Sequence, residues 1–249
     1  MNRLENKIAL VTGGNSGIGQ AIAIEMAKEG ATVVVSDLAN SDTQETMAQV
    51  HQYSPDSIFL PIDVSDEQNV IAGIEELVAK FGRLDIAVNN AGVDAPSAQI
   101  HEIETKDWNR VIGINLNGQF YCTKHQLKQF LKQGGGTIVA VASLAGLLTI
   151  PGQLAYVCSK HGTLGLVKTV AAEYGQQNIR ANAICPYYIA TNMTAGADDE
   201  VRKLWLEDTP MHRLGELKEV AQAAVFYASD ESGYCNGNAL VLDGGKHIK

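Results

Sequence analysis

Tyr156 and Lys160 have the residue types and the spacing of an acid–base pair. They stand at positions i and i+4 of a helical stretch, so their side chains share one face of the helix, one turn apart. A phenol with an ordinary pKa near ~10 is a poor base at neutral pH, and a neighbouring ammonium group favours its phenolate form. When such a pair stands alone it is usually a surface pair, so its meaning depends on the residues around it.

Ser143 is a further polar group that could take part in the same chemistry. It follows the apolar run 138–141, which has the pattern of a strand buried on both faces. The carboxyl ends of parallel strands form the edge at which doubly wound sheets bind ligands. A hydroxyl group at that edge can hydrogen-bond to a substrate oxygen and stabilise the charge that develops on it.

A glycine-rich stretch lies near the N-terminus. Residues 12–19 read Thr-Gly-Gly-Asn-Ser-Gly-Ile-Gly, between the apolar run 8–11 and an alanine-rich helical pattern that reaches residue 30. Glycines let the backbone turn sharply close to an anion, and the start of a helix directs free N–H groups toward it. We therefore expect a phosphate-binding loop, with a glycine-rich loop that binds no ligand as the alternative. The candidate binding residues are Gly13, Asn15, Ser16, Gly17 and Gly19.

Asp37 follows the second apolar run, 18 residues after Gly19. A carboxylate at this place accepts hydrogen bonds from a ribose diol and repels a 2′-phosphate. Positions 14 and 38 are Gly and Leu, so neither supplies a cation for that phosphate. The pattern favours NAD over NADP as the cofactor. The alternative is that Asp37 only caps the turn after the strand.

Alternating strand and helix patterns position these groups. The apolar runs 8–11, 32–35, 58–60, 86–88, 138–141 and 239–242 are typical of buried strands, and helical patterns separate them. This order predicts a single α/β domain over residues 1–249, a three-layer, doubly wound sheet of about seven mostly parallel strands with helices on both faces. Residues 65–68 fit a capping box for the helix that ends at Gly82.

The segment 190–217 interrupts this alternation. It shows no clear strand, and only residues 200–207 have a helical pattern. A connection of this length in a compact domain is usually a lid or binding loop. We expect a substrate lid, because apolar side chains such as Met193 and Trp205 indicate that the segment covers a binding site. A disordered surface insertion is the alternative.

Composition and charge exclude several classes of function. The 249 residues carry a net charge of −9, without the positive field that binds nucleic acid or anionic membranes. No apolar run reaches the ~18 residues of a membrane span, and the N-terminal segment lacks the apolar core of a signal peptide. The four cysteines are far apart, so we interpret them as reduced thiols of a cytoplasmic protein. No His or Cys cluster predicts a metal site.

Along its whole length the sequence resembles the short-chain dehydrogenase/reductase family. The resemblance is carried by the glycine pattern Thr12 to Gly19, Asp63-Val64, Asn89-Asn90-Ala91-Gly92, Asn115, Ser143, Tyr156-x-x-x-Lys160 and Asp243-Gly244-Gly245. It implies a Rossmann fold, a homotetramer, and hydride transfer between a nicotinamide cofactor and a secondary alcohol or its ketone. The helices expected over 106–132 and 153–178 would pair the subunits, through apolar residues that include Tyr121, Leu127, Phe130, Leu164, Val167 and Val170.

The resemblance also implies roles for single residues. Tyr156 would be the general base or acid, Ser143 would stabilise the substrate oxygen, and Lys160 would lower the pKa of Tyr156 and hold the nicotinamide ribose. Asn115 would anchor a water molecule in a proton relay. For Asn90, a purely structural role between neighbouring strands is an equal alternative. The further cofactor contacts implied are Ile18, Asp63, Val64, Asn90, Ala91, Gly92, Pro186, Ile189 and Thr191.

One position departs from the family pattern and bears on the substrate. Tyr187 follows Pro186 where the family usually has Gly, so it would narrow the pocket or stack on a cyclic substrate, unless its ring turns outward. The predicted substrate contacts are Ser143, Ala145, Gln153, Tyr156, Tyr187, Met193 and Trp205. They are mostly apolar, with no Arg placed for an anion, which favours a neutral, cyclic or steroid-like alcohol. The alternatives are a 3-oxoacyl-type or sugar alcohol dehydrogenase, an enoyl reductase and a non-catalytic NAD sensor.

Overall fold

A parallel sheet forms the centre of the molecule. The computed structural model describes residues 2–191, 194, 196 and 198–248. Its strands pair in the order β3-β2-β1-β4-β5-β6-β7, and every pairing is parallel. The strands are β1 (Ile8–Thr12), β2 (Thr32–Asp37), β3 (Ile58–Pro61), β4 (Ile86–Asn89), β5 (Gly136–Val141), β6 (Ile179–Pro186) and β7 (Ala239–Leu242). The predicted doubly wound α/β fold is confirmed, and the strand order reverses between β1 and β4.

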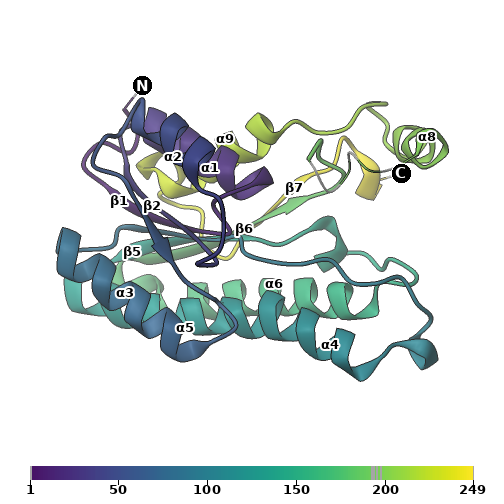
Figure 1. Cartoon of the computed structure of the whole chain (residues 1–249), viewed down its shortest axis with the longest axis horizontal. Helices are drawn as coiled ribbons and strands as arrows, with labels where there is room; N and C mark the ends of the chain where they lie inside the picture. Colours follow the sequence, from purple (N-terminus) through teal and green to yellow (C-terminus); the bar gives the residue numbers. More distant parts are fainter. Residues whose placement is uncertain (1, 192–193, 195, 197, 249) are drawn as a thin grey trace.

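Helices cover both faces of the sheet. On one face lie α1 (Gly17–Lys28), α2 (Gln44–His51) and α9 (Leu217–Ala228) (Figure 1). On the other face lie α3 (Glu67–Phe81), α4 (Thr105–Ile112), α5 (Gly118–Gln133) and α6 (Leu154–Tyr174). A hydrophobic core lies on each face of the sheet, and successive residues of a strand point into opposite cores. In β2, Val33 and Val35 pack under α1, and Val34 packs toward α3 and α5. Because both faces are covered, most strands are apolar through their centres; β6 is the exception, with Arg180 and Asn182 among its residues.

Two predicted helices have internal structure that the apolar pattern does not show. The helix expected over 106–132 consists of α4, a π-helical segment (Gly113–Asn117) and α5. The helix expected over 153–178 is α6 followed by a 3₁₀ turn (Gly175–Gln177), and it ends at Asn178 with a φ of 58°. The π segment inserts an extra residue into the helical repeat, and Asn115 within it is fully buried.

The expected subunit-pairing residues lie inside the molecule. Leu127, Phe130, Leu164, Val167 and Val170 are all buried in the core between the sheet and its helices. The expectation that these five pair subunits is therefore wrong, because an interface needs side chains that the fold leaves exposed. Tyr121, the sixth residue of that expectation, is only partly buried. A homotetramer stays a prediction.

The start of α3 differs from the expected capping box. The N-cap is Asp66, whose side chain accepts a hydrogen bond of 2.9 Å from Gln68 N. Ser65 instead donates its hydroxyl to Asp63 Oδ1 at 2.6 Å. The predicted stop at Gly82 is confirmed, with a φ of 78° that favours glycine.

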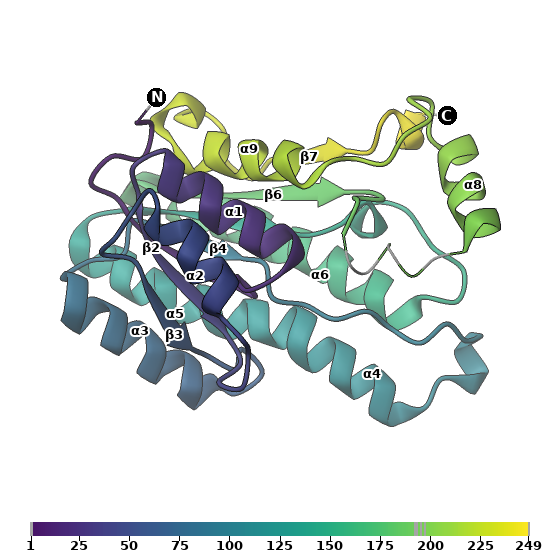
Figure 2. The ribbon, with the colours of Figure 1, turned by 45° about the horizontal axis from the view of Figure 1, so that its top comes forward.

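The segment after β6 carries a helix at one end of the molecule. Helix α8 (Asp199–Asp208) spans the expected 200–207, and its N-cap is Asp198, whose carboxylate accepts from Val201 N. It lies beside the C-terminal turn Lys246–Ile248 (Figure 2). Met193, a predicted lid residue, lies outside the described residues. Among the described residues, no helix is both long and apolar enough to cross a membrane.

Candidate active site

Ser143, Tyr156 and Lys160 come together where β5 ends beside α6. Ser143 accepts a hydrogen bond of 3.1 Å from Ala145 N, which fixes its hydroxyl at the first turn after the strand. Tyr156 forms a side-chain hydrogen bond with Ser143. The Nζ atom of Lys160 lies 5.5 Å from the centre of the Tyr156 ring. The structure therefore gathers the three predicted catalytic side chains into one cluster, in which Lys160 is buried and Ser143 and Tyr156 are half-buried.

Burial controls the proton affinities in this cluster. It raises the pKa of Tyr156 above the ordinary tyrosine value, while the hydrogen bond from Ser143 acts in the lowering direction. In the protein alone, desolvation is the largest effect on this pKa, and the expected lowering by Lys160 is not seen. Lys160 is buried as well, and this lowers its pKa to about 8. Its Nζ donates to Val141 O at 3.0 Å.

The lowered pKa of Lys160 makes stability depend on pH. The unfolded chain holds this proton with the ordinary pKa of 10.5, and the folded protein with a pKa of about 8. Between these values the unfolded state binds more protons, so the free energy of unfolding rises with pH. In Lys160→Met we expect this rise to be smaller by on the order of 2 kcal/mol between pH 7 and pH 10. Urea unfolding at several pH values measures it, and parallel curves would contradict the assignment.

Asn115 connects the cluster to the strand β4 side of the site. Its side chain accepts from Val93 N at 2.7 Å and donates to Val93 O at 2.8 Å. The same amide group donates to Ser159 Oγ at 3.3 Å, and Ser159 donates to Tyr156 O at 2.7 Å. Asn115 therefore reaches Tyr156 through Ser159, a residue that the sequence analysis missed although it lies three positions from Tyr156 on α6. The predicted water relay stays a prediction.

The loop after β1 is shaped to admit an anion. Gly13 and Gly17 have φ values of 60° and 53°, which favour glycine. Ser16 precedes α1 without capping it by its side chain, so the first N–H groups of the helix keep no acceptor from that residue. Ile18 is the second residue of α1 and belongs to this turn. The loop fits the phosphates of a dinucleotide, because Gly17 at the start of α1 lines a cavity.

Asn90 holds this loop in place. Its side-chain amide donates to Thr12 O and to Gly13 O, both at 3.0 Å. Thr12 Oγ1 in turn accepts from the N–H groups of Asn90 and Ala91 at 3.1 and 3.2 Å. These bonds favour the structural role of Asn90. Gly92 lies so close to Asn115 that an added Cβ would stand 3.2 Å from its Oδ1.

The two carboxylates predicted to contact the adenosine, Asp37 and Asp63, already accept hydrogen bonds from other residues of the chain. Asp37 accepts from Leu38 N at 2.8 Å and from Ser41 Oγ at 3.1 Å, so it caps the following turn as the alternative stated. Its other oxygen lies 3.3 Å from Asn15 N. Asp63 accepts from Ser65, and the adjacent Val64 is buried. Since each carboxylate oxygen has two lone pairs, these bonds leave Asp37 able to accept from a ribose.

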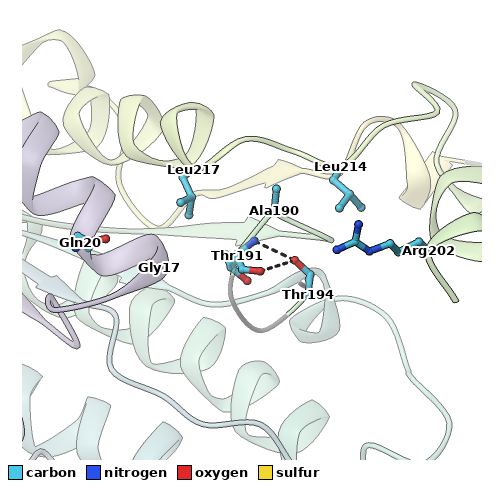
Figure 3. A pocket seen from close by; sticks show the side chains of 8 residues that line it. All are labelled: Gly17, Gln20, Ala190, Thr191, Thr194, Arg202, Leu214 and Leu217. Atoms are coloured by element: carbon cyan, nitrogen blue, oxygen red, sulfur yellow. Dashed lines mark hydrogen bonds between the residues drawn. The ribbon is translucent and has the colours of Figure 1, made fainter. Parts of the chain in front are cut away.

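A cavity of about 390 Å³ opens beside the glycine loop (Figure 3). Thr191 belongs to its wall, whereas the side chain of Ile189 is buried in the core under α9. The Ile189 backbone forms a bridge to Gly215, which fixes the start of the segment after β6. Pro186 ends β6 with its carbonyl oxygen 3.5 Å from Ser143 Oγ. The residues lining this cavity are Gly17, Gln20, Ala190, Thr191, Thr194, Arg202, Leu214 and Leu217.

The predicted substrate residues do not all meet. Ala145 is buried next to Ser143, and Gln153 Oε1 is buried without a hydrogen-bond partner in the described part of the chain. Tyr187 donates its hydroxyl to Asp208 Oδ2 at 2.8 Å, and burial raises its pKa. Tyr188 stacks on Trp205 with ring centres 4.4 Å apart.

Tyr187 also lines a second cavity, of about 350 Å³, with Tyr188, Met211 and Gly244. Neither Ser143 nor Tyr156 is among the described residues that line it. Tyr187 and Trp205 are thus connected to α8 and the C-terminal segment, and a role in substrate binding stays a prediction.

Fold and site together define a class of enzymes: oxidoreductases that bind a dinucleotide at the switch point of a doubly wound sheet. A family model described as enoyl-(acyl carrier protein) reductase matches residues 13–247. The 3-oxoacyl-[acyl-carrier-protein] reductase of Thermotoga maritima is 38% identical over 243 residues, 98% of each chain. The cyclohexanol dehydrogenase of an Acinetobacter species is 37% identical, over 98% of this chain and 96% of that one.

Solved structures agree with this classification. The crystal structure of levodione reductase superposes with a TM-score of 0.94 and 32% identity, covering 98% of this chain and 99% of that one. The chain belongs to the short-chain dehydrogenase/reductase family and is an oxidoreductase that uses a nicotinamide cofactor.

Proposed function

We propose that the protein is an NAD-dependent dehydrogenase of secondary alcohols that also reduces the corresponding ketones. The observation that carries this proposal is the cluster of Ser143, Tyr156 and Lys160 at the carboxyl edge of β5. A hydroxyl, a phenol and an ammonium group in one partly buried site suit proton transfer at an alcohol oxygen. The intact cluster favours this function over a non-catalytic sensor.

Each side chain has a defined task in this proposal. Tyr156 takes the proton of the alcohol during oxidation and returns a proton during reduction. Ser143 donates a hydrogen bond to the same oxygen and stabilises its developing charge. The nicotinamide, when bound, supplies the hydride chemistry. Lys160 would hold the nicotinamide ribose, and its ammonium group favours the phenolate of Tyr156 against the desolvation that raises the pKa of that tyrosine.

The proposed preference for NAD rests on Asp37. Its carboxylate ends β2 beside the glycine loop, 3.3 Å from Asn15 N, where a 2′-phosphate would meet like charge. We expect Asp37→Ser to weaken NADH binding roughly 10-fold and to strengthen NADPH binding, because a charged acceptor is lost and the repulsion disappears. Fluorescence titration with both reduced cofactors measures the two changes.

Asp42→Ser is the matched control for Asp37→Ser. Asp42 lies in the loop after β2, is exposed, and its carboxylate accepts only from Gln44 N among the described hydrogen bonds. We expect this variant to keep the NADH preference of the wild type. A wild-type protein that binds NADPH more tightly than NADH would refute the assignment of the cofactor.

The proposed substrate is neutral and cyclic. Support comes from the apolar neighbours of Ser143 and from two relatives whose names give cyclic compounds, cyclohexanol and levodione. The relative from Thermotoga maritima makes a 3-oxoacyl thioester the second candidate. Segment 190–217, including Tyr187's partner helix α8, would form the lid over this substrate. Rates with matched cyclic ketones and a 3-oxoacyl thioester distinguish the two candidates, because only one should reach an efficient kcat/KM.

A further inference from the structure

Helix α8 is not held in place by the hydrophobic core. None of its ten residues, Asp199–Asp208, is buried, and Leu204 is 62% exposed. A helix in a protein gains most of its stability by packing an apolar face, so the position of α8 depends on other contacts. Its second half contacts both the residues that follow β6 and the C-terminal turn Lys246–Ile248 (Figure 2).

Asp208 joins three parts of the chain. Its Oδ2 atom accepts a hydrogen bond of 2.8 Å from the hydroxyl of Tyr187, and its Oδ1 atom pairs with the ammonium group of Lys246. Tyr187 follows β6, Asp208 ends α8, and Lys246 begins the C-terminal turn. All three side chains are half-buried. A hydrogen bond to an ionised acceptor is stronger than one between neutral groups, so this carboxylate is a firm attachment point for α8.

Aromatic rings add a second attachment next to the first. Trp205, three residues before Asp208, stacks on Tyr188 with ring centres 4.4 Å apart and 24° between the rings. The ring of Tyr188 lies against that of Tyr187, with centres 4.1 Å apart. Thr209 is buried and donates its hydroxyl to Trp205 O at 2.9 Å, at the end of the helix. The two residues that follow β6 therefore hold α8 by a hydrogen bond and by stacking.

The same two residues lead directly to the catalytic serine. The peptide group between Pro186 and Tyr187 has both polar atoms engaged. Pro186 O lies 3.5 Å from Ser143 Oγ, and Tyr187 N donates to Leu242 O of β7 at 3.0 Å. The backbone of Tyr187 is thus fixed beside Ser143, while its hydroxyl group is bound on α8.

We propose that Tyr187 is a positioning residue, which fixes α8 relative to Ser143 and so sets how closely this helix lies over the bound alcohol. This inference rests on the proposed function, because it takes α8 as part of the lid over the substrate. Tyr187 then acts through Asp208 and not by contact with the substrate. Glycine, the usual residue of the family at this position, has no side chain that could reach α8.

The test measures NAD-dependent oxidation of cyclohexanol by Tyr187→Phe, Asp208→Ala and the double variant. Tyr187→Phe keeps the ring and removes only the hydroxyl group. We expect each single variant to raise KM roughly 10-fold, the effect of one lost hydrogen bond to a charged group. We expect kcat to change less than about 2-fold, because Ser143 keeps its bond from Ala145 N. Since both changes remove the same bond, the double variant should have the KM of Asp208→Ala.

Fluorescence of Trp205 reports on the position of α8 without any substrate. The chain has two tryptophans, so Trp205 is the only one in a Trp108→Phe background. Loss of the Tyr187 hydroxyl frees the second half of α8 to move away from Tyr188. We therefore expect acrylamide to quench Trp205 more strongly in Tyr187→Phe than in the parent protein.

Two control variants make matched changes elsewhere. Tyr227 of α9 donates to Asn238 Oδ1 at 2.5 Å, so Tyr227→Phe loses a phenolic hydrogen bond that does not involve α8. Glu207→Ala removes the neighbouring carboxylate of α8, which pairs with Lys203 of the same helix at 3.8 Å. We expect both variants to keep the wild-type KM and the wild-type quenching of Trp205. Thermal unfolding verifies that every variant is folded.

Three results would overturn the inference while the enzyme remains active. The first is a wild-type KM in Tyr187→Phe. The second is a raised KM in Tyr187→Phe but not in Asp208→Ala, which would make Tyr187 a direct substrate contact. The third is a double variant in which the two effects on KM multiply. A wild type that oxidises no alcohol would instead refute the proposed function, and unchanged quenching of Trp205 in Tyr187→Phe would separately refute the attachment of α8.

Discussion

Tyr156→Phe is expected to lower kcat/KM for alcohol oxidation by ~10²- to 10⁴-fold, the usual contribution of a positioned general base. The substitution removes the hydroxyl that hydrogen-bonds to Ser143 and leaves the ring in place. Binding of NADH should change little, because the phenol acts on the substrate oxygen. Steady-state rates and NADH titrations on the same preparation give both quantities.

The pH profile provides a second result for the same variant. Oxidation by the wild type should speed up as pH rises toward the pKa of Tyr156, because the phenolate is the base. Tyr156→Phe should lack this ascending limb. Tyr174→Phe, at the other end of α6, makes the same change outside the cluster and should keep both the rate and the limb. Wild-type rates in Tyr156→Phe would exclude Tyr156 as the acid–base group.

Gly19→Ala is expected to disrupt the glycine loop and to weaken NADH binding at least 10-fold. A Cβ at Gly19 would lie 2.0 Å from Gly13 O and 2.5 Å from Asn90 Nδ2. The backbone of the loop must move to make room, and the bond between Asn90 and Gly13 would be lost. Overpacking of this kind usually costs about 1–3 kcal/mol of stability. Urea unfolding and NADH titration measure the two effects.

The control for Gly19→Ala is the same substitution in a helix with open space. A Cβ at Gly165 of α6 meets nothing within 4 Å among the described atoms. Gly165→Ala should raise stability by roughly 0.5–1 kcal/mol, because alanine restricts the unfolded chain and favours the helix. If Gly19→Ala bound NADH normally with wild-type stability, the close packing of this loop would have no functional role.

The regular parts of the fold could be predicted from the sequence. Six strands contain a continuous apolar run, and the run 239–242 matches β7 residue for residue. Strand β6 is not one of them, because Arg180 and Asn182 interrupt its apolar residues. The stop of α3 could be predicted as well, because only glycine readily adopts the φ of 78° at Gly82. These features depend on local chemistry, which a single sequence displays directly.

The features that were missed depend on long-range contacts. The π-helical segment leaves the apolar period almost unchanged, so the burial of Asn115 could not be seen. Tyr187 was considered as a substrate contact, yet its partner Asp208 lies on α8, 21 residues away.

The effect of burial on the pKa of Tyr156 is also invisible in the sequence. Spacing shows that Lys160 is close, but it does not show how far the fold removes water from either group. Burial raises the pKa of Tyr156 and lowers that of Lys160. The ammonium group of Lys160 also donates a hydrogen bond to Val141 O. The balance between charge and desolvation could be assessed only with the side chains in place.

The most direct test of the central claim is the initial rate of NADH formation at pH 8 to 9. The panel contains cyclic alcohols, hydroxysteroids, sugar alcohols and 3-hydroxyacyl thioesters, each with NAD and with NADP. We expect turnover of at least one cyclic secondary alcohol, faster with NAD than with NADP. Tight NADH binding without turnover of any alcohol or ketone, or NADH consumption only with an activated C=C bond, would contradict it.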